Sequence, residues 1–231
     1  MKPLAKWLTR IVLALTLLLL LWQGWYFGWV VWWKYADPGM TRFMEIRLEE
    51  ARAKNPKAVQ QHRWQPYGKI SMQLKRAVIA AEDDKFVDHE GFDWDGIQKA
   101  MEKNQRKGKV VAGGSTISQQ LAKNLFLTPS KTHWRKAQEA VITLMLEMLW
   151  DKQRILEVYL NSVEWGDGVF GAEAAARRYF NQSAAQLSAE QAARLAVMLP
   201  APRRFEKNPY SPFVNERTQA VLGRMQYAEV P

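Results

Sequence analysis

Three consecutive carboxylates, Glu82-Asp83-Asp84, follow an apolar segment that ends in Ile79-Ala80-Ala81. Like charges crowded at the edge of an apolar surface raise one another's pKa. A carboxylate in such a place can act as a general base or acid near neutral pH. Acidic runs at helix ends are also commonly just solvated, so this run alone only nominates Glu82 for catalysis.

A second segment of interest begins with Gly113-Gly114-Ser115-Thr116. Two glycines followed by Ser and Thr predict a loop that enters a helix, and Thr116 with Gln119 has the spacing of a capping box. The N-terminus of that helix would offer backbone N–H groups to an anion. A well-capped surface helix is the equally good bland interpretation. Beside its apolar face the helix should carry a polar stripe with one cation, made of Thr116, Gln120, Lys123 and Asn124.

A cationic segment comes next, with Lys131, Arg135 and Lys136. Glu139 lies four positions after Arg135, so the two side chains share a helix face. The group could be an ordinary exposed ion pair, or a clamp for a diphosphate in which Glu139 orients the bases. The local sequence does not decide between these two interpretations.

Other chemistries lack their signatures. His62, His89 and His133 are scattered and form no metal-ligand pair at helical spacing, and His89 alone is better explained as structural. The chain has no cysteine, which excludes disulfides and thiolate metal sites. The Gly-x-Ser-x-Gly elbow is absent, and so are the Ser-x-x-Lys and Lys-Thr-Gly patterns of penicillin-binding transpeptidases.

The elements that must position these groups begin with an uncharged run from Ile11 to Trp33. As a helix it would be roughly 34 Å long, enough to cross a bilayer. The positive charge before the run predicts a cytoplasmic N-terminus, and its length and end disfavour a cleaved signal peptide. Its tryptophans fit an aromatic belt better than a face for a partner's membrane helix. Asp37-Pro38-Gly39 should end the helix.

We expect one domain, residues 36–231, after a tail and anchor in residues 1–35. The formal charge is +10, with +6 on the exported part, which suits anionic headgroups or a pyrophosphate better than nucleic acid. Strand patterns are nearly absent, apart from Lys109 to Ala112, and Lys99 to Lys109 fits a basic loop. The stretch from Arg42 to Lys57 fits a helical or irregular neck. Helical periodicity covers 74–81, 117–125, 137–150, 155–160, 172–180 and 189–199, with a last helix near 217–227.

Taken in order, these segments resemble the family 51 glycosyltransferases, and most closely their monofunctional biosynthetic peptidoglycan transglycosylases. Five segments carry the resemblance, which extends from about Ile70 to Pro209: Glu82 to Gly91, Gly114 to Asn124, Arg135-Lys136 with Glu139, Lys152 to Asn161, and Gly168 to Phe180. Ser118 and Gln138 depart slightly, standing where the family usually has Thr and where many members carry Lys. The basic stretch from Lys99 to Lys109 fits the mobile segment that lies beside the acceptor site in relatives, and a solvated loop is the equally good alternative. We interpret the last two segments mostly as scaffold, with direct substrate contact by Lys152 a lesser alternative.

The resemblance implies a mainly α, lysozyme-like helical domain that uses lipid II. Glu82 would then be the general base that takes the proton from the acceptor's 4-hydroxyl group, and Glu139 would be the second essential glutamate. The transition state needs carboxylate near the sugar and cations near the departing pyrophosphate. The expected substrate-binding residues are Asp83, Ser115, Thr116, Gln119, Gln120, Lys123, Lys131, Arg135 and Lys136.

The resemblance also places the enzyme in the bacterial inner membrane, with its catalytic domain in the periplasm. Expected partners are lipid II, the nascent glycan strand, the membrane and, through the membrane helix, proteins of wall synthesis or division; nucleic acid is not expected. A divalent cation, Mg²⁺ or Mn²⁺, is compatible with the family, but the sequence has no dedicated ligand set. A lytic enzyme with a similar fold and an inactive membrane scaffold are the alternatives.

Overall fold

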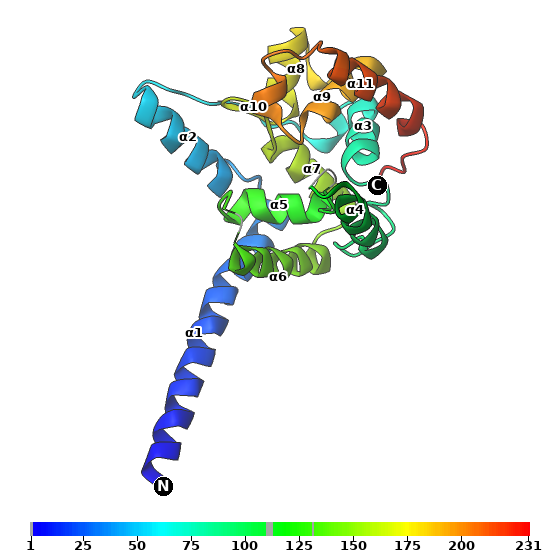
Figure 1. Cartoon of the computed structure of the whole chain (residues 1–231). Coiled ribbons are helices and arrows are strands. Elements are labelled where there is room, and N and C mark those ends of the chain that lie inside the picture. The colour runs from blue at the N-terminus through cyan, green and yellow to red at the C-terminus, as the bar shows by residue number, and fades with distance from the viewer. Residues whose placement is uncertain (1, 110–112, 131) are drawn as a thin grey trace.

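A computed structural model describes residues 2–109, 113–130 and 132–231 of the chain. Helix α1 (Lys2–Tyr35) projects as a single rod from a helical domain (Figure 1). Residues Lys6–Tyr35 are long and apolar enough to cross a membrane, and the helix ends just before Asp37-Pro38-Gly39. The predicted helix and its end are confirmed, and its length and composition fit a membrane anchor.

The domain is mainly helical, as predicted. Its helices are α2 (Arg42–Lys54), α3 (Met72–Glu82), α4 (Trp94–Lys107), α5 (Ile117–Phe126), α6 (His133–Leu149), α7 (Lys152–Ser162), α8 (Ala172–Phe180), α9 (Ala189–Met198), α10 (Pro202–Phe205) and α11 (Pro212–Met225), with 3₁₀ turns at Tyr67–Lys69 and Ala184–Gln186. Two helices start earlier than their apolar patterns indicate. Thr132 caps α6 and Ser211 caps α11, where Pro212 takes the first helical position.

The core lies where α3 packs against α9 and α11, and where α5 packs against α6 and α7. Its largest fully buried side chains include Trp165, Tyr159 and Phe86. In Figure 1, α5 and α6 lie on the side of the domain nearest α1, while α8, α9 and α11 lie on the far side. The helix that ends in Glu82 packs on the side of the domain formed by α9 and α11.

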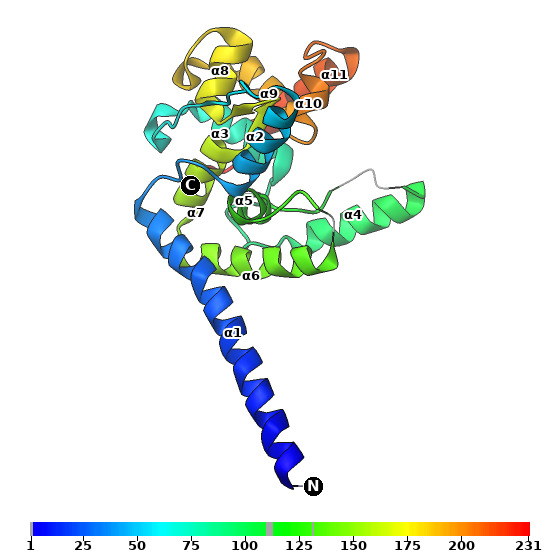
Figure 2. The ribbon, with the colours of Figure 1, turned by 90° about the vertical axis from the view of Figure 1, so that its left-hand side faces the viewer.

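We expected the basic segment from Lys99 to Lys109 to be a loop. Instead, α4 includes it up to Lys107. The Asp93 side chain accepts a hydrogen bond from the backbone of Gly96 at the start of α4, and Gly108 ends it in the left-handed conformation. These end signals define the helix, although it buries few side chains. Figure 2 shows α4 extending away from the rest of the domain.

A small sheet was missed by the sequence analysis. Strand β3 (Val169–Phe170) lies between β1 (Gln61–His62), which is parallel to it, and β2 (Glu164–Gly166), which is antiparallel. Such short strands cannot display a period-two pattern. The candidate strand at Lys109 to Ala112 falls largely outside the described residues, and Lys109 itself is in a bend.

The upper part of α1 packs against the domain. The rings of Trp22 and Trp134 stack 5.9 Å apart, and the amides of Gln23 and Gln138 donate to each other at 2.9 and 3.0 Å. Part of the aromatic set therefore contacts the chain's own domain and does not serve only as a belt. The Gln138 departure also has an explanation, since a lysine there would bring a charge against the apolar helix.

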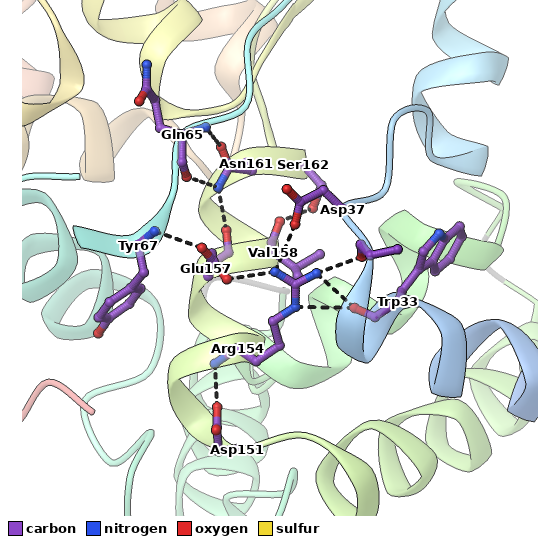
Figure 3. A network of polar contacts seen from close by, with 11 residues as sticks. Trp33, Asp37, Gln65, Tyr67, Asp151, Arg154, Glu157, Val158, Asn161 and Ser162 are labelled. Carbon is purple, nitrogen blue, oxygen red and sulfur yellow. Dashed lines mark hydrogen bonds and ion pairs between the residues drawn. The ribbon is translucent and has the colours of Figure 1, made fainter. Parts of the chain in front are cut away.

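Arg154 of α7 fastens the C-terminal end of α1 (Figure 3). Its guanidinium donates to the carbonyl oxygen of Trp33 at 2.9 and 3.2 Å and to that of Ala36 at 2.7 Å. It also pairs with Asp37 at 3.0 Å and with Glu157 at 2.7 Å. One side chain thus caps the membrane helix and ties it to the domain.

Candidate active site

Glu82 is the last residue of α3, and it lies between two cavities. One, of about 190 Å³, is largely polar and includes Asp83, Asp84 and Ser115 in its wall. The other, of about 290 Å³, has a more apolar wall that includes Val197 but also Arg217 and Arg224. A carboxylate at this junction can reach groups bound on either side.

Burial is the main cause of an elevated pKa at Glu82. Gln120 Nε2 donates to Glu82 Oε2 at 2.7 Å, and this bond and the charge of Lys123 both lower the pKa. The charge of Asp83 raises it and is the smallest of these effects. The elevated pKa agrees with our expectation, but its main cause is burial, not the crowding of like charges.

Asp83 makes its polar contacts with other residues of the protein. Its buried carboxylate pairs with His89 Nε2 at 2.9 Å and accepts the backbone N–H of Ile117 at 2.9 Å. His89 Nδ1 accepts from the backbone of Gly91, which leaves Nε2 as the donor to Asp83. His89 is structural, as we expected. However, the first N–H group of α5 is occupied by Asp83, so the predicted anion site at this helix end is already filled by the chain's own carboxylate.

The predicted capping box at the start of α5 is confirmed. The Thr116 hydroxyl accepts from the backbone of Gln119 and donates to the carbonyl of Gly91 at 2.7 Å, while Gln119 Oε1 accepts from the Thr116 backbone. Thr116, Gln119 and Asn124 are buried, so the polar stripe is narrower than predicted. Ser115 and Thr116 line the polar cavity, and Gln120 contacts Glu82.

Glu139 gathers the cations of the third segment. Its side chain is only 4% exposed and forms ion pairs with both Arg135 and Lys136. The Lys136 side chain is 46% exposed and also reaches Ser115 Oγ at 3.4 Å. Because Glu139 is buried, its ion pairs with Arg135 and Lys136 are not ordinary surface salt bridges. Lys131 lies outside the described residues.

Lys123 connects the two glutamates electrostatically. Burial lowers its pKa, while the charges of Glu139 and, more weakly, Glu82 raise it. Arg135 and Lys136 oppose its protonation. The structure therefore gathers Glu82, Lys123 and Glu139 into one charged group, although they are far apart in the sequence.

Lys152 is held by contacts within the protein. Its ammonium group pairs with Glu147 at 2.8 Å and donates to the carbonyl of His89. Glu147 also accepts from the hydroxyl of Ser118. Gly91 lies close by at φ +87°, where an added Cβ would meet Thr143 at 2.7 Å. These contacts support Lys152 as scaffold, the interpretation that we preferred.

No group of three or more His, Asp or Glu residues in the described ranges could hold a metal ion. The obvious carboxylates are already engaged, because Asp83 binds His89 and Ile117 and Glu139 binds two cations. The residues present do not fit a divalent ion, and we assign it no step.

Sequence reasoning missed two residues at the site. Tyr159, fully buried, donates to Gln120 Oε1 at 3.0 Å. Arg224 of α11 contributes to the walls of both cavities beside Glu82. The helical pattern of α7 makes Tyr159 look like ordinary core, and nothing in the sequence near Arg224 indicates that α11 folds back onto α3.

Comparisons with known proteins identify the relatives. A transglycosylase family model matches residues 49–226, a wider range than the resemblance predicted. The chain is 63% identical to a biosynthetic peptidoglycan transglycosylase of Dechloromonas aromatica (strain RCB) and 61% identical to one of Azoarcus sp. (strain BH72), each over the full length of both chains. A protein of the same description from Herminiimonas arsenicoxydans is 56% identical, again over the full length of both.

Proposed function

Because the chain belongs to the transglycosylase family, among the biosynthetic peptidoglycan transglycosylases, we propose that Glu82 is the general base of its glycosyl transfer. The protein polymerises glycan strands in cell-wall biosynthesis. The observation that carries the assignment is the place of Glu82 at the junction of two cavities, with burial raising its pKa. An elevated pKa makes the carboxylate a stronger base toward the hydroxyl proton that it must take.

The Glu82 carboxylate accepts the proton of the 4-hydroxyl group on the acceptor lipid II. The freed oxygen attacks the anomeric carbon of the growing strand while the bond from that carbon to the pyrophosphate breaks. Undecaprenyl pyrophosphate leaves with the bonding electrons, and attack from the opposite face converts the α linkage into a β-1,4 linkage. Gln120 keeps the base oriented by donating to Glu82 Oε2.

Lys123, Arg135 and Lys136 stabilise the negative charge that develops on the leaving pyrophosphate, and Ser115 adds a hydroxyl beside them. Glu139 is a positioning residue, since it is buried and holds Arg135 and Lys136 in one orientation. Lys131 is expected to add a further cation. The cationic group favours a polymerase over a lytic enzyme, because strand cleavage releases no pyrophosphate for these cations to stabilise.

Asp83, Thr116 and Gln119 act on substrate indirectly. Their side chains are buried and hydrogen-bonded within the protein, where they hold the start of α5. We therefore assign them the positioning of Ser115 and Gln120, in place of the direct substrate contact that the sequence predicted.

The anchor holds the active site at the surface where its substrates are dissolved. Residues 6–21 of α1 are exposed and would span about 24 Å, less than the roughly 30 Å of a bilayer core. The outer leaflet would then extend to the level of Trp22, where the domain packs against α1. Exposed apolar side chains on α6, including Trp134, Leu144 and Met148, suit that depth. This supports a domain seated in the outer leaflet of the inner membrane, with the basic N-terminus in the cytoplasm.

The face of α1 that carries Trp25 and Trp32 is exposed, whereas Tyr26 and Trp33 pack against the domain. We expect the exposed face to meet lipid or the membrane helices of wall-synthesis or division proteins. This assignment can be tested by exchanging both tryptophans for leucine, which should weaken crosslinking to such partners and leave polymerisation in pure vesicles unchanged.

Incubation of the full-length protein with lipid II in vesicles tests the proposed function. We expect glycan polymer, with one undecaprenyl pyrophosphate released for each new linkage. Soluble fragments released from intact sacculi, without polymer from lipid II, would indicate a lytic enzyme. Equal polymerisation by the parent and by Glu82→Gln would remove Glu82 from the mechanism.

A further inference from the structure

The hydroxyl of Tyr159 is a polar group placed in the hydrophobic core. The residue lies in the middle of α7 and is fully buried among apolar side chains. A buried hydroxyl group without a partner destabilises a protein, so its partner is informative. The partner here is Gln120 Oε1, at 3.0 Å. The other end of the same amide donates to Glu82 at 2.7 Å.

These two bonds define the direction of the Gln120 amide. In the observed orientation Nε2 faces Glu82 and Oε1 faces Tyr159. If the amide flipped, Oε1 would meet the carboxylate, and only a protonated Glu82 could then donate to it. A phenol is a better donor than acceptor, so Tyr159 favours the observed orientation. Burial and nearby carboxylates hold the pKa of Tyr159 well above its usual value, so the donor proton stays in place.

We propose that Tyr159 is a positioning residue for the base, acting through Gln120 to keep an N–H donor aimed at Glu82 and so favour its carboxylate form. The proposal rests on Glu82 being the base. It gives a residue of the fourth segment, which otherwise looks like scaffold, a part in the reaction. Linked hydrogen bonds of this kind polarise one another, so the Tyr159 bond also strengthens the Gln120 donor.

Other charged groups near Glu82 must stay unchanged for a clean test. Lys123 faces it from α5, Asp83 follows it in the chain, and Arg217 and Arg224 approach from α11 along the cavity walls. Asp84 lines the polar cavity. A Tyr159→Phe substitution removes one oxygen and leaves all five of these groups in place.

The experiment compares kcat/KM for lipid II polymerisation across pH in the full-length parent and in Tyr159→Phe. Without the phenol the flipped amide becomes accessible, which favours protonated Glu82. We expect the acidic limb of the profile to move up by about one pH unit, a loss of about tenfold below the limb and little change above it. A purely structural role would lower the rate by a similar factor at every pH.

Tyr179→Phe is the matched control. Tyr179 also donates one hydrogen bond from a phenol, to the carbonyl of Trp165 at 2.9 Å, but it has no contact with Gln120 or Glu82. Its pH profile should overlie that of the parent. If Tyr159→Phe also overlies the parent, or loses the same factor at all pH values, the inference is wrong.

Gln120→Leu provides a second route, because it removes the intermediary. If Tyr159 acts through the amide, adding Tyr159→Phe to Gln120→Leu should not shift the limb further. Additive shifts would contradict the proposed connection. Failure of the base assignment itself would look different, since Glu82→Gln would then polymerise at the parent rate whatever Tyr159 does.

Discussion

Replacing Arg154 with alanine should loosen the joint between the membrane helix and the domain. The Arg154 side chain is 14% exposed, and its guanidinium contacts two carbonyl groups and two carboxylates. Hydrogen bonds that involve a charged group contribute about 1.5–3 kcal/mol each, but those of one side chain are not additive. The Asp37 side chain is 53% exposed, so that pair adds at most about 1 kcal/mol. We therefore expect Arg154→Ala to lower the free energy of unfolding by about 3 kcal/mol.

Urea unfolding in detergent micelles, followed by tryptophan fluorescence, measures this change. The rings of Trp64 and Trp150 lie 5.5 and 5.8 Å from the Arg154 guanidinium carbon, so the signal reports on the joint. Asp37→Ala is the control and should cost no more than about 1 kcal/mol. If Arg154→Ala unfolds at the same urea concentration as Asp37→Ala, the described network does not hold α1 in place.

Three further changes test the remaining parts of the account. Glu139→Gln should lower kcat/KM by on the order of tenfold or more, because Arg135 and Lys136 lose their shared partner. It should also move the alkaline limb of the pH profile to lower pH, since the charge of Glu139 raises the pKa of Lys123. An unchanged profile would refute the positioning role. Deleting residues 2–20 keeps the docked part of α1 and should slow polymerisation of membrane-embedded lipid II more than that of detergent-dispersed lipid II; equal losses would count against the anchor. Arg224→Gln should raise KM with little change in Tm, because Arg224 is exposed in both cavities beside Glu82; an unchanged KM would exclude it from substrate binding.

Helical periodicity predicted most of the fold because the core is built from apolar faces of helices. The apolar spacing of 117–125 and the Thr116–Gln119 pair defined α5 almost to its ends. Helix α4 escaped notice because it buries little more than Ala100 and is recognisable mainly by its Asp93 and Gly108 caps. The early start of α11 likewise depends on a cap and a proline rather than on apolar spacing.

At the site, sequence patterns nominated residue types but could not assign their contacts. The acidic run nominated Glu82, yet its elevated pKa comes first from burial, which is a property of the packed fold. Asp83 looked like a substrate ligand, but its position brings it to the first N–H group of α5. The bond from Tyr159 to Gln120 joins residues 39 positions apart, and no local pattern encodes such a contact.

The pH dependence of polymerisation by the parent and by Glu82→Gln tests the central claim most directly. Burial raises the pKa of Glu82, so kcat/KM of the parent should rise with pH through a limb above the usual glutamate range, as the carboxylate becomes available. Glu82→Gln should lose this limb and be slower by about 10²–10⁴-fold, the usual contribution of a general base. A Glu82→Gln variant that keeps both the rate and the acidic limb of the parent would contradict the account.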